Sequence, residues 1–82
     1  MTLATAANVL IPAFLALQEK GYSVRIEIAE NQQLWFAEKA DLRCVAEDPL
    51  LLLGLVALYD TRGENWRATD EQIEEFLRRY PS

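Results

Sequence analysis

Apolar residues recur at helical spacing in the first part of the chain, from about Leu3 to Lys20. Thr2 or Thr5 could cap this helix, and Gly21 stands where a helix commonly ends in a left-handed residue. Pro12 has no N–H and crowds the preceding turn, so it predicts either a kink or the start of a shorter helix. We favour the kink. The expected apolar stripe comprises Leu3, Ala6, Ala7, Leu10, Phe14 and Leu17.

After Gly21 the apolar period changes from 3.6 to 2. Apolar and polar residues alternate over residues 22–29, and this alternation predicts a half-buried strand. Residues 34–39 and 42–47 are expected to form two more strands. Glu30 to Gln33 supplies the first turn, in which Asn31 is the residue best suited to a left-handed conformation, and Ala40-Asp41 forms a tight second connection. Such short connections predict an antiparallel meander.

Asp48-Pro49 is a strong helix start, with a carboxylate at the N-cap and proline at the first helical position. We expect this helix to run to Arg62 and to stop at Gly63. Its first ten residues after the proline, LLLLGLVALY, have no polar face. A helix that is apolar all round must be enclosed on nearly every side. Gly54 is less helical than alanine by about 1 kcal/mol, and its presence suggests the close approach of another backbone.

A last helix is predicted from the capping box Thr69-x-x-Gln72. Its acidic residues come early and its arginines late, as the helix dipole favours, and Pro81 ends it. The expected apolar face consists of Ile73, Phe76, Leu77 and Tyr80. The whole chain is therefore expected to be one small α+β domain of order α-β-β-β-α-α, a three-stranded antiparallel meander with helices packed on one face.

Charge and cysteine content narrow the classes of partner. The 82 residues carry a formal net charge of −5 and no histidine, which disfavours nucleic acid and anionic membranes as partners. Cys44 is the only cysteine, so no internal disulfide can form. No basic residue precedes the first apolar run, and neither apolar run reaches the roughly 18 residues of a membrane span. We expect a cytoplasmic protein.

The residue types present argue against most enzyme chemistry. Without histidine, a Ser-His-Asp or Cys-His arrangement is excluded, and zinc would need mostly carboxylate ligands. The three glycines are isolated, so there is no glycine-rich phosphate loop. Cys44, at an alternating strand position, is expected to be a small core residue. We therefore expect no catalytic, cofactor or metal site.

Aromatic residues offer the candidates for recognition. Trp35 and Phe36 are adjacent on a strand, so one of them must point away from the main core. Trp66 lies in a polar loop, where we expect it to fold back as a plug over the core. Alternatively it forms an exposed anchor with Arg62 and Arg67, since tryptophan and arginine are enriched in interface hot spots.

The chain carries more apolar surface than one face of a three-stranded sheet can cover. The last helix could cover part of it, but we prefer a homodimer in which the central helix, or the exposed sheet face around Trp35, packs against its copy. The candidate interface comprises Trp35, Leu52, Val56, Tyr59, Arg62, Trp66 and Arg67.

These features favour a non-enzymatic protein-interaction module, homodimeric, whose specific role the sequence leaves open. The order of elements and the acidic charge are similar to those of small bacterial chaperone and immunity proteins, an analogy of fold and charge only. It suggests an alternative function, an inhibitor that neutralises a basic protein partner. A third hypothesis is an enzyme or small-ligand binder with a polar-lined pocket between the sheet and the first helix.

Overall fold

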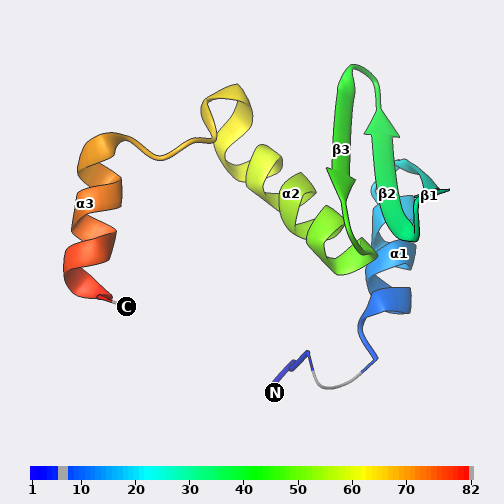
Figure 1. The fold of residues 1–82 in the computed structure, drawn as a ribbon, viewed down its shortest axis with the longest axis horizontal. Coiled ribbons are helices and arrows are strands. Elements are labelled where there is room, and N and C mark those ends of the chain that lie inside the picture. The colour runs from blue at the N-terminus through cyan, green and yellow to red at the C-terminus, as the bar shows by residue number, and fades with distance from the viewer. Residues whose placement is uncertain (6–7, 82) are drawn as a thin grey trace.

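The computed structural model describes residues 1–5 and 8–81, which form three α-helices, a short 3-10 helix and one antiparallel sheet (Figure 1). This confirms the expected fold class. The elements are α1 (Leu10–Glu19), β1 (Ser23–Ala29), β2 (Gln32–Lys39), β3 (Leu42–Ala46), α2 (Pro49–Arg62), η1 (Gly63–Asn65) and α3 (Asp70–Arg79).

The sheet is a meander in the order β1-β2-β3, joined by two tight turns. Glu30 and Asn31 have positive φ angles of 49° and 67°, and Ala40 has a φ of 53°. Asn31 is thus left-handed, as predicted. Two positive φ angles in succession give the turn a twist that matches the right-handed twist of the flanking strands. The second strand begins two residues earlier than expected because this turn uses only two residues.

Helix α1 is shorter than predicted: it begins at Leu10 instead of Leu3. Pro12 lies in its first turn, where a missing N–H removes no intrahelical hydrogen bond, so the predicted kink is wrong and the alternative of a shorter helix is correct. Val9 is the N-cap residue and makes no side-chain capping bond, so neither Thr2 nor Thr5 caps the helix. The expected stripe positions Ala6 and Ala7 lie outside the described residues.

Local capping residues fix the other helix ends where the sequence predicted them. Gly21 has a φ of 91°, and Tyr22 N donates to Leu17 O at 3.0 Å to close α1. At the start of α2, Asp48 Oδ1 accepts from Leu51 N at 2.8 Å. Gly63, with a φ of 70°, ends the same helix.

The core lies between α1, α2 and one face of the sheet. Leu17, Leu52 and Val56 are fully buried and pack with Ala37 and Cys44 from the strands and with Tyr22, which directly precedes β1. Leu52 and Val56 therefore belong to the interior, and their assignment to a candidate interface is wrong. The predicted role of Cys44 as a small core residue is confirmed.

On the opposite face of the sheet, Phe36 is covered without a second layer. Phe36 points to this face and is only 7% exposed, because the guanidinium groups of Arg25 and Arg43 lie 4.1 Å and 5.1 Å from its ring centroid. Glu38 accepts from Arg25 Nε at 3.2 Å and lies 3.8 Å from Arg43 Nε. Trp35 lies on the other face, partly buried against the core. The prediction of an exposed sheet face around Trp35 is therefore wrong, because Phe36 is the aromatic residue that points away from the helices.

Helix α3 stands apart from the rest of the molecule (Figure 1). Its capping box is complete: Gln72 N donates to Thr69 Oγ1 at 3.2 Å, and Thr69 N donates to Gln72 Oε1 at 2.9 Å. Every residue of α3 is nevertheless exposed. The helix is well formed and covers none of the apolar surface that the sequence left unassigned.

The size of the molecule reflects this arrangement. Its accessible surface is 6833 Å², whereas a compact monomer of 9.4 kDa has about 5,000 Å². Its radius of gyration is 15.1 Å, against about 12 Å for a compact domain of 82 residues.

Within the described ranges, no helix is long and apolar enough to cross a membrane.

Two adjacent leucines of α2 test the location of the core. Leu52 is fully buried and Leu51 is 52% exposed. We expect Leu52→Asp to reduce the free energy of unfolding by about 5 kcal/mol or more, because it places a charge in the core and removes apolar burial. In urea denaturation of the dilute monomer, Leu51→Asp should have a free energy of unfolding close to that of the wild type. Equal losses for the two variants would contradict this core.

Candidate functional site

Helix α3 and its C-cap residue Tyr80 carry an apolar face that nothing in the described part of the chain covers. Its four side chains, Ile73, Phe76, Leu77 and Tyr80, are between 47% and 60% exposed. Phe76 and Tyr80 are stacked at a tilt, with ring centroids 5.3 Å apart, so the two rings form one apolar surface. Glu75 fixes the polar side of the helix by accepting from Arg78 at 2.8 Å and from Arg79 at 3.3 Å. The helix is thus pre-formed with its apolar face in solvent.

A second apolar surface lies on the body of the molecule, along α2 and the free edge of β3. Leu51 and Leu55 point outward from α2, and Leu55 is 38% exposed. A hollow of about 190 Å³ adjoins Leu55, and we call it the α2–β3 groove. The groove is lined by Leu42, Arg43, Cys44, Val45, Leu55, Leu58, Tyr59 and Trp66.

Nothing in the described part of the chain approaches Gly54 on α2. A Cβ atom built there would meet no heavy atom within 4 Å. The expected close approach of another backbone is therefore not made within the chain. Gly54 instead leaves part of the outer side of α2 flat and open.

Trp66 does not plug the core, as the sequence had suggested. Its side chain is 41% exposed and stands at the end of α2, where Arg62 Nε donates to its carbonyl oxygen at 2.9 Å. The guanidinium of Arg67 lies 4.4 Å from the Trp66 ring centroid. The three residues of the expected anchor, Arg62, Trp66 and Arg67, are thus brought together at the point where the chain leaves the body toward α3.

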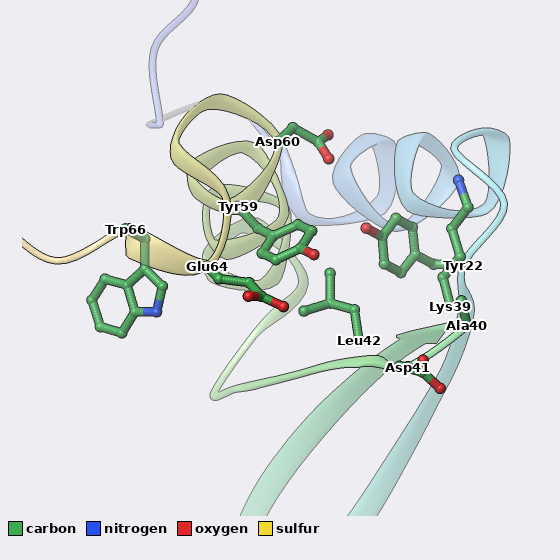
Figure 2. Close-up of a pocket in the computed structure, with 9 residues that line it drawn as sticks. All are labelled: Tyr22, Lys39, Ala40, Asp41, Leu42, Tyr59, Asp60, Glu64 and Trp66. Atoms are coloured by element: carbon green, nitrogen blue, oxygen red, sulfur yellow. The ribbon is translucent and has the colours of Figure 1, made fainter.

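An acidic cavity of about 630 Å³ opens beside these residues, between the end of α2 and the β2–β3 turn (Figure 2). Asp41, Asp60 and Glu64 line it together with the aromatic rings of Tyr22, Tyr59 and Trp66. Lys39 is its one basic lining residue, and Lys39 Nζ donates to Lys20 O at 2.8 Å. Asp60 also lies 3.6 Å from Lys20 Nζ. The cavity therefore keeps an excess of negative charge beside aromatic surface.

Burial keeps the two titratable residues of the core neutral. Burial raises the pKa of the Cys44 thiol, and the nearby Asp60 carboxylate raises it further. The pKa of Tyr22 is raised by burial first and then by Asp60. Cys44 is thus held as a thiol, which is the less nucleophilic form.

The pocket beside α1 offers little polar chemistry. A hollow of about 270 Å³ lies between the segment before α1 and the first turns of α1 and α2. It is lined by apolar residues apart from Thr5. No strand residue lines it, so it is not the pocket between the sheet and the first helix that the small-ligand hypothesis describes. Among the residues that the structure describes, no group of three His, Cys, Asp or Glu side chains could hold a metal ion.

The structure divides the predicted interface residues into two groups. Leu52 and Val56 lie in the core and Trp35 is half-buried against it, whereas Tyr59, Arg62, Trp66 and Arg67 gather around the end of α2. Sequence reasoning missed the acidic cavity, because three distant segments contribute to it and no local pattern marks it. It also assigned no interface role to α3, although the amphipathic pattern of that helix was recognised.

Comparison with other proteins adds no assignment. No protein-family model matches the sequence, and no similar protein was found among curated sequences or solved structures.

The two raised pKa values predict a loss of stability at alkaline pH. Each group is neutral when folded, so its contribution is present below its ordinary pKa, 9.0 for cysteine and 10.0 for tyrosine, and is lost as pH rises toward the folded value. Urea unfolding should show a constant free energy from pH 7 to 8. Above about pH 9 it should fall by at most about 1.4 kcal/mol per pH unit for each group.

Cys44→Val is the matched variant for this titration, because it keeps the apolar volume and removes the thiol. The fall between about pH 9 and 10 should be shallower in Cys44→Val than in the wild type. An identical fall in both proteins would show that Cys44 does not contribute.

Proposed function

We propose that this chain is a small, non-enzymatic protein-interaction module that acts as a homodimer. The observation that carries the proposal is the apolar face of α3, four large side chains held in solvent on a fully capped helix. Monomeric proteins rarely expose contiguous apolar patches of this kind unless the patch meets a partner.

The energetics of α3 support this proposal. An isolated helix of fewer than about 12 residues is marginal in water, and α3 has ten. Its capping box and its two Glu75–arginine pairs each stabilise it by about 1 kcal/mol or less. Full burial of a leucine, isoleucine or phenylalanine side chain contributes about 1.5–3 kcal/mol. Burial of this face against a partner is thus the largest stabilising contribution open to the helix.

The total exposed area supports self-association. The chain exposes about 1,800 Å² more surface than a compact monomer of its mass. A standard protein interface buries about 800 Å² per partner, and obligate homodimers bury about 1,000–2,500 Å². The excess therefore matches what a stable dimer covers.

Light scattering coupled to size exclusion tests the proposal directly. At micromolar concentration we expect twice the chain mass of 9.4 kDa. Phe76→Glu should give a folded monomer, because it places a charge in the centre of the α3 face. Arg78→Glu, on the polar side of the same helix, should remain dimeric. A wild-type chain that is monomeric at every concentration would contradict the homodimer.

One observation favours the alternative function, an inhibitor or immunity-type protein that neutralises a basic partner. The acidic cavity combines Asp41, Asp60 and Glu64 with exposed tryptophan. Carboxylates beside aromatic faces suit an arginine or lysine side chain, which gains both ion pairing and cation–π contact.

An arginine-rich peptide is a suitable probe for this alternative. Its binding should weaken at least about tenfold in the double variant Asp41→Asn/Glu64→Gln, because two carboxylates of the cavity lose their charge. It should also weaken with rising salt. The double variant Glu71→Gln/Glu74→Gln on α3 removes the same charge elsewhere and should bind like the wild type. If both double variants bound the peptide equally weakly, its binding would depend on the net charge of the protein and not on the cavity.

A further inference from the structure

The chain exposes two apolar surfaces that nothing in its described part covers. One is a face of a helix, and the other is a groove on the body of the molecule. The helix is α3, with Ile73, Phe76, Leu77 and Tyr80 in solvent. The surface is the α2–β3 groove together with Leu51, the outward residue of α2 one turn before Leu55. Both are predominantly apolar and both are continuous over two to three helical turns. Each therefore has the chemistry that the other needs.

The connection between α2 and α3 directs α3 away from its own groove. Trp66 lies at the end of the groove, and the chain leaves the body there toward Thr69, the N-cap of α3. The Trp66 carbonyl is held by Arg62 Nε at 2.9 Å, and its ring is stacked against Arg67 at 4.4 Å. To enter its own groove, α3 would have to reverse the direction of the chain between Trp66 and Thr69. Figure 1 shows it instead projecting away from α2 and the sheet.

We propose that two copies exchange α3, so that the α3 of each copy packs into the α2–β3 groove of the other. The proposal rests on the proposed function, of which it specifies the partner and the contact. Exchange of an identical element is a low-cost route to a twofold dimer, because one contact is used twice. In such a dimer both uncovered surfaces are covered at once.

The exposed area agrees with this occupant. The excess of about 1,800 Å² per chain is more than a face-to-face contact of standard size needs, and it falls within the range of obligate dimers.

A mixing experiment separates exchange from the other ways of covering these surfaces. One variant, Phe76→Glu, disables the helix, and another, Leu55→Glu, disables the groove. Both residues are exposed, at 60% and 38%, so each chain should fold, which circular dichroism checks. Each variant alone should dissociate, with the dimer dissociation constant raised at least about 100-fold, because both contacts in its dimer carry the change.

Mixed in equal amounts and refolded together from urea, the two variants should form a heterodimer visible by native mass spectrometry. In that pair the α3 of the Leu55→Glu chain enters the groove of the Phe76→Glu chain, and this contact is entirely wild type. The matched control is the double variant Phe76→Glu/Leu55→Glu. Mixed with Phe76→Glu, it offers no intact contact and should give no heterodimer.

Each other result has a distinct meaning. A wild-type dimer whose two variants dissociate but do not complement each other would overturn the exchange and leave the interaction module standing. A Phe76→Glu chain that stays dimeric would also overturn the exchange and leave the interaction module standing. A wild-type chain that is monomeric at all concentrations, with α3 folded back or free, would overturn the exchange and the proposed homodimer together.

Discussion

The packing of one apolar helix against one sheet face is the contact on which the rest of this structure depends. Leu52 and Val56 of α2 meet Leu17 of α1 and the strand residues Ala37 and Cys44, and together they form most of the interior. Only one side of α2 can take part, because a three-stranded sheet is narrow and α1 covers the remaining area. The other sides of a helix that is apolar all round are consequently left in solvent.

The two faces of the sheet differ in how their apolar side chains are covered. On the open face, two arginines cover Phe36 and one glutamate binds both of them, while Leu34 and Val45 stay exposed there. The side of α2 next to β3 has no such cover. Uncovered apolar side chains lie on α2, on the edge of β3 and on α3, and also on α1 and on β1, where Ile11 and Ile28 are 60% and 70% exposed.

Local chemistry made much of the fold predictable, and long-range contacts made the rest unpredictable. Asp48-Pro49, Thr69-Gln72 and Gly21 set helix ends through bonds within a few residues, so the sequence predicted them correctly. The start of α1 was misplaced because apolar periodicity continues before Pro12, where the sequence pattern could not distinguish a helix from an extended segment. The faces of Trp35 and Phe36 were misassigned because strand alternation does not say which parity meets the helices. The acidic cavity and the separation of α3 depend on how distant segments are placed, and no local pattern marks either.

In the proposed dimer, another copy of the chain covers the apolar face of α3 in solution. Hydrogen exchange of the amides of residues 73–80, measured across a dilution series from micromolar to nanomolar chain concentration, tests this contact most directly. An unassociated helix of ten residues opens readily, whereas a packed one is protected. We expect strong protection of these amides at micromolar concentration that disappears on dilution, while the amides of β2 stay protected throughout. Protection of α3 that does not change with concentration, or no protection at any concentration, would contradict the proposed dimer.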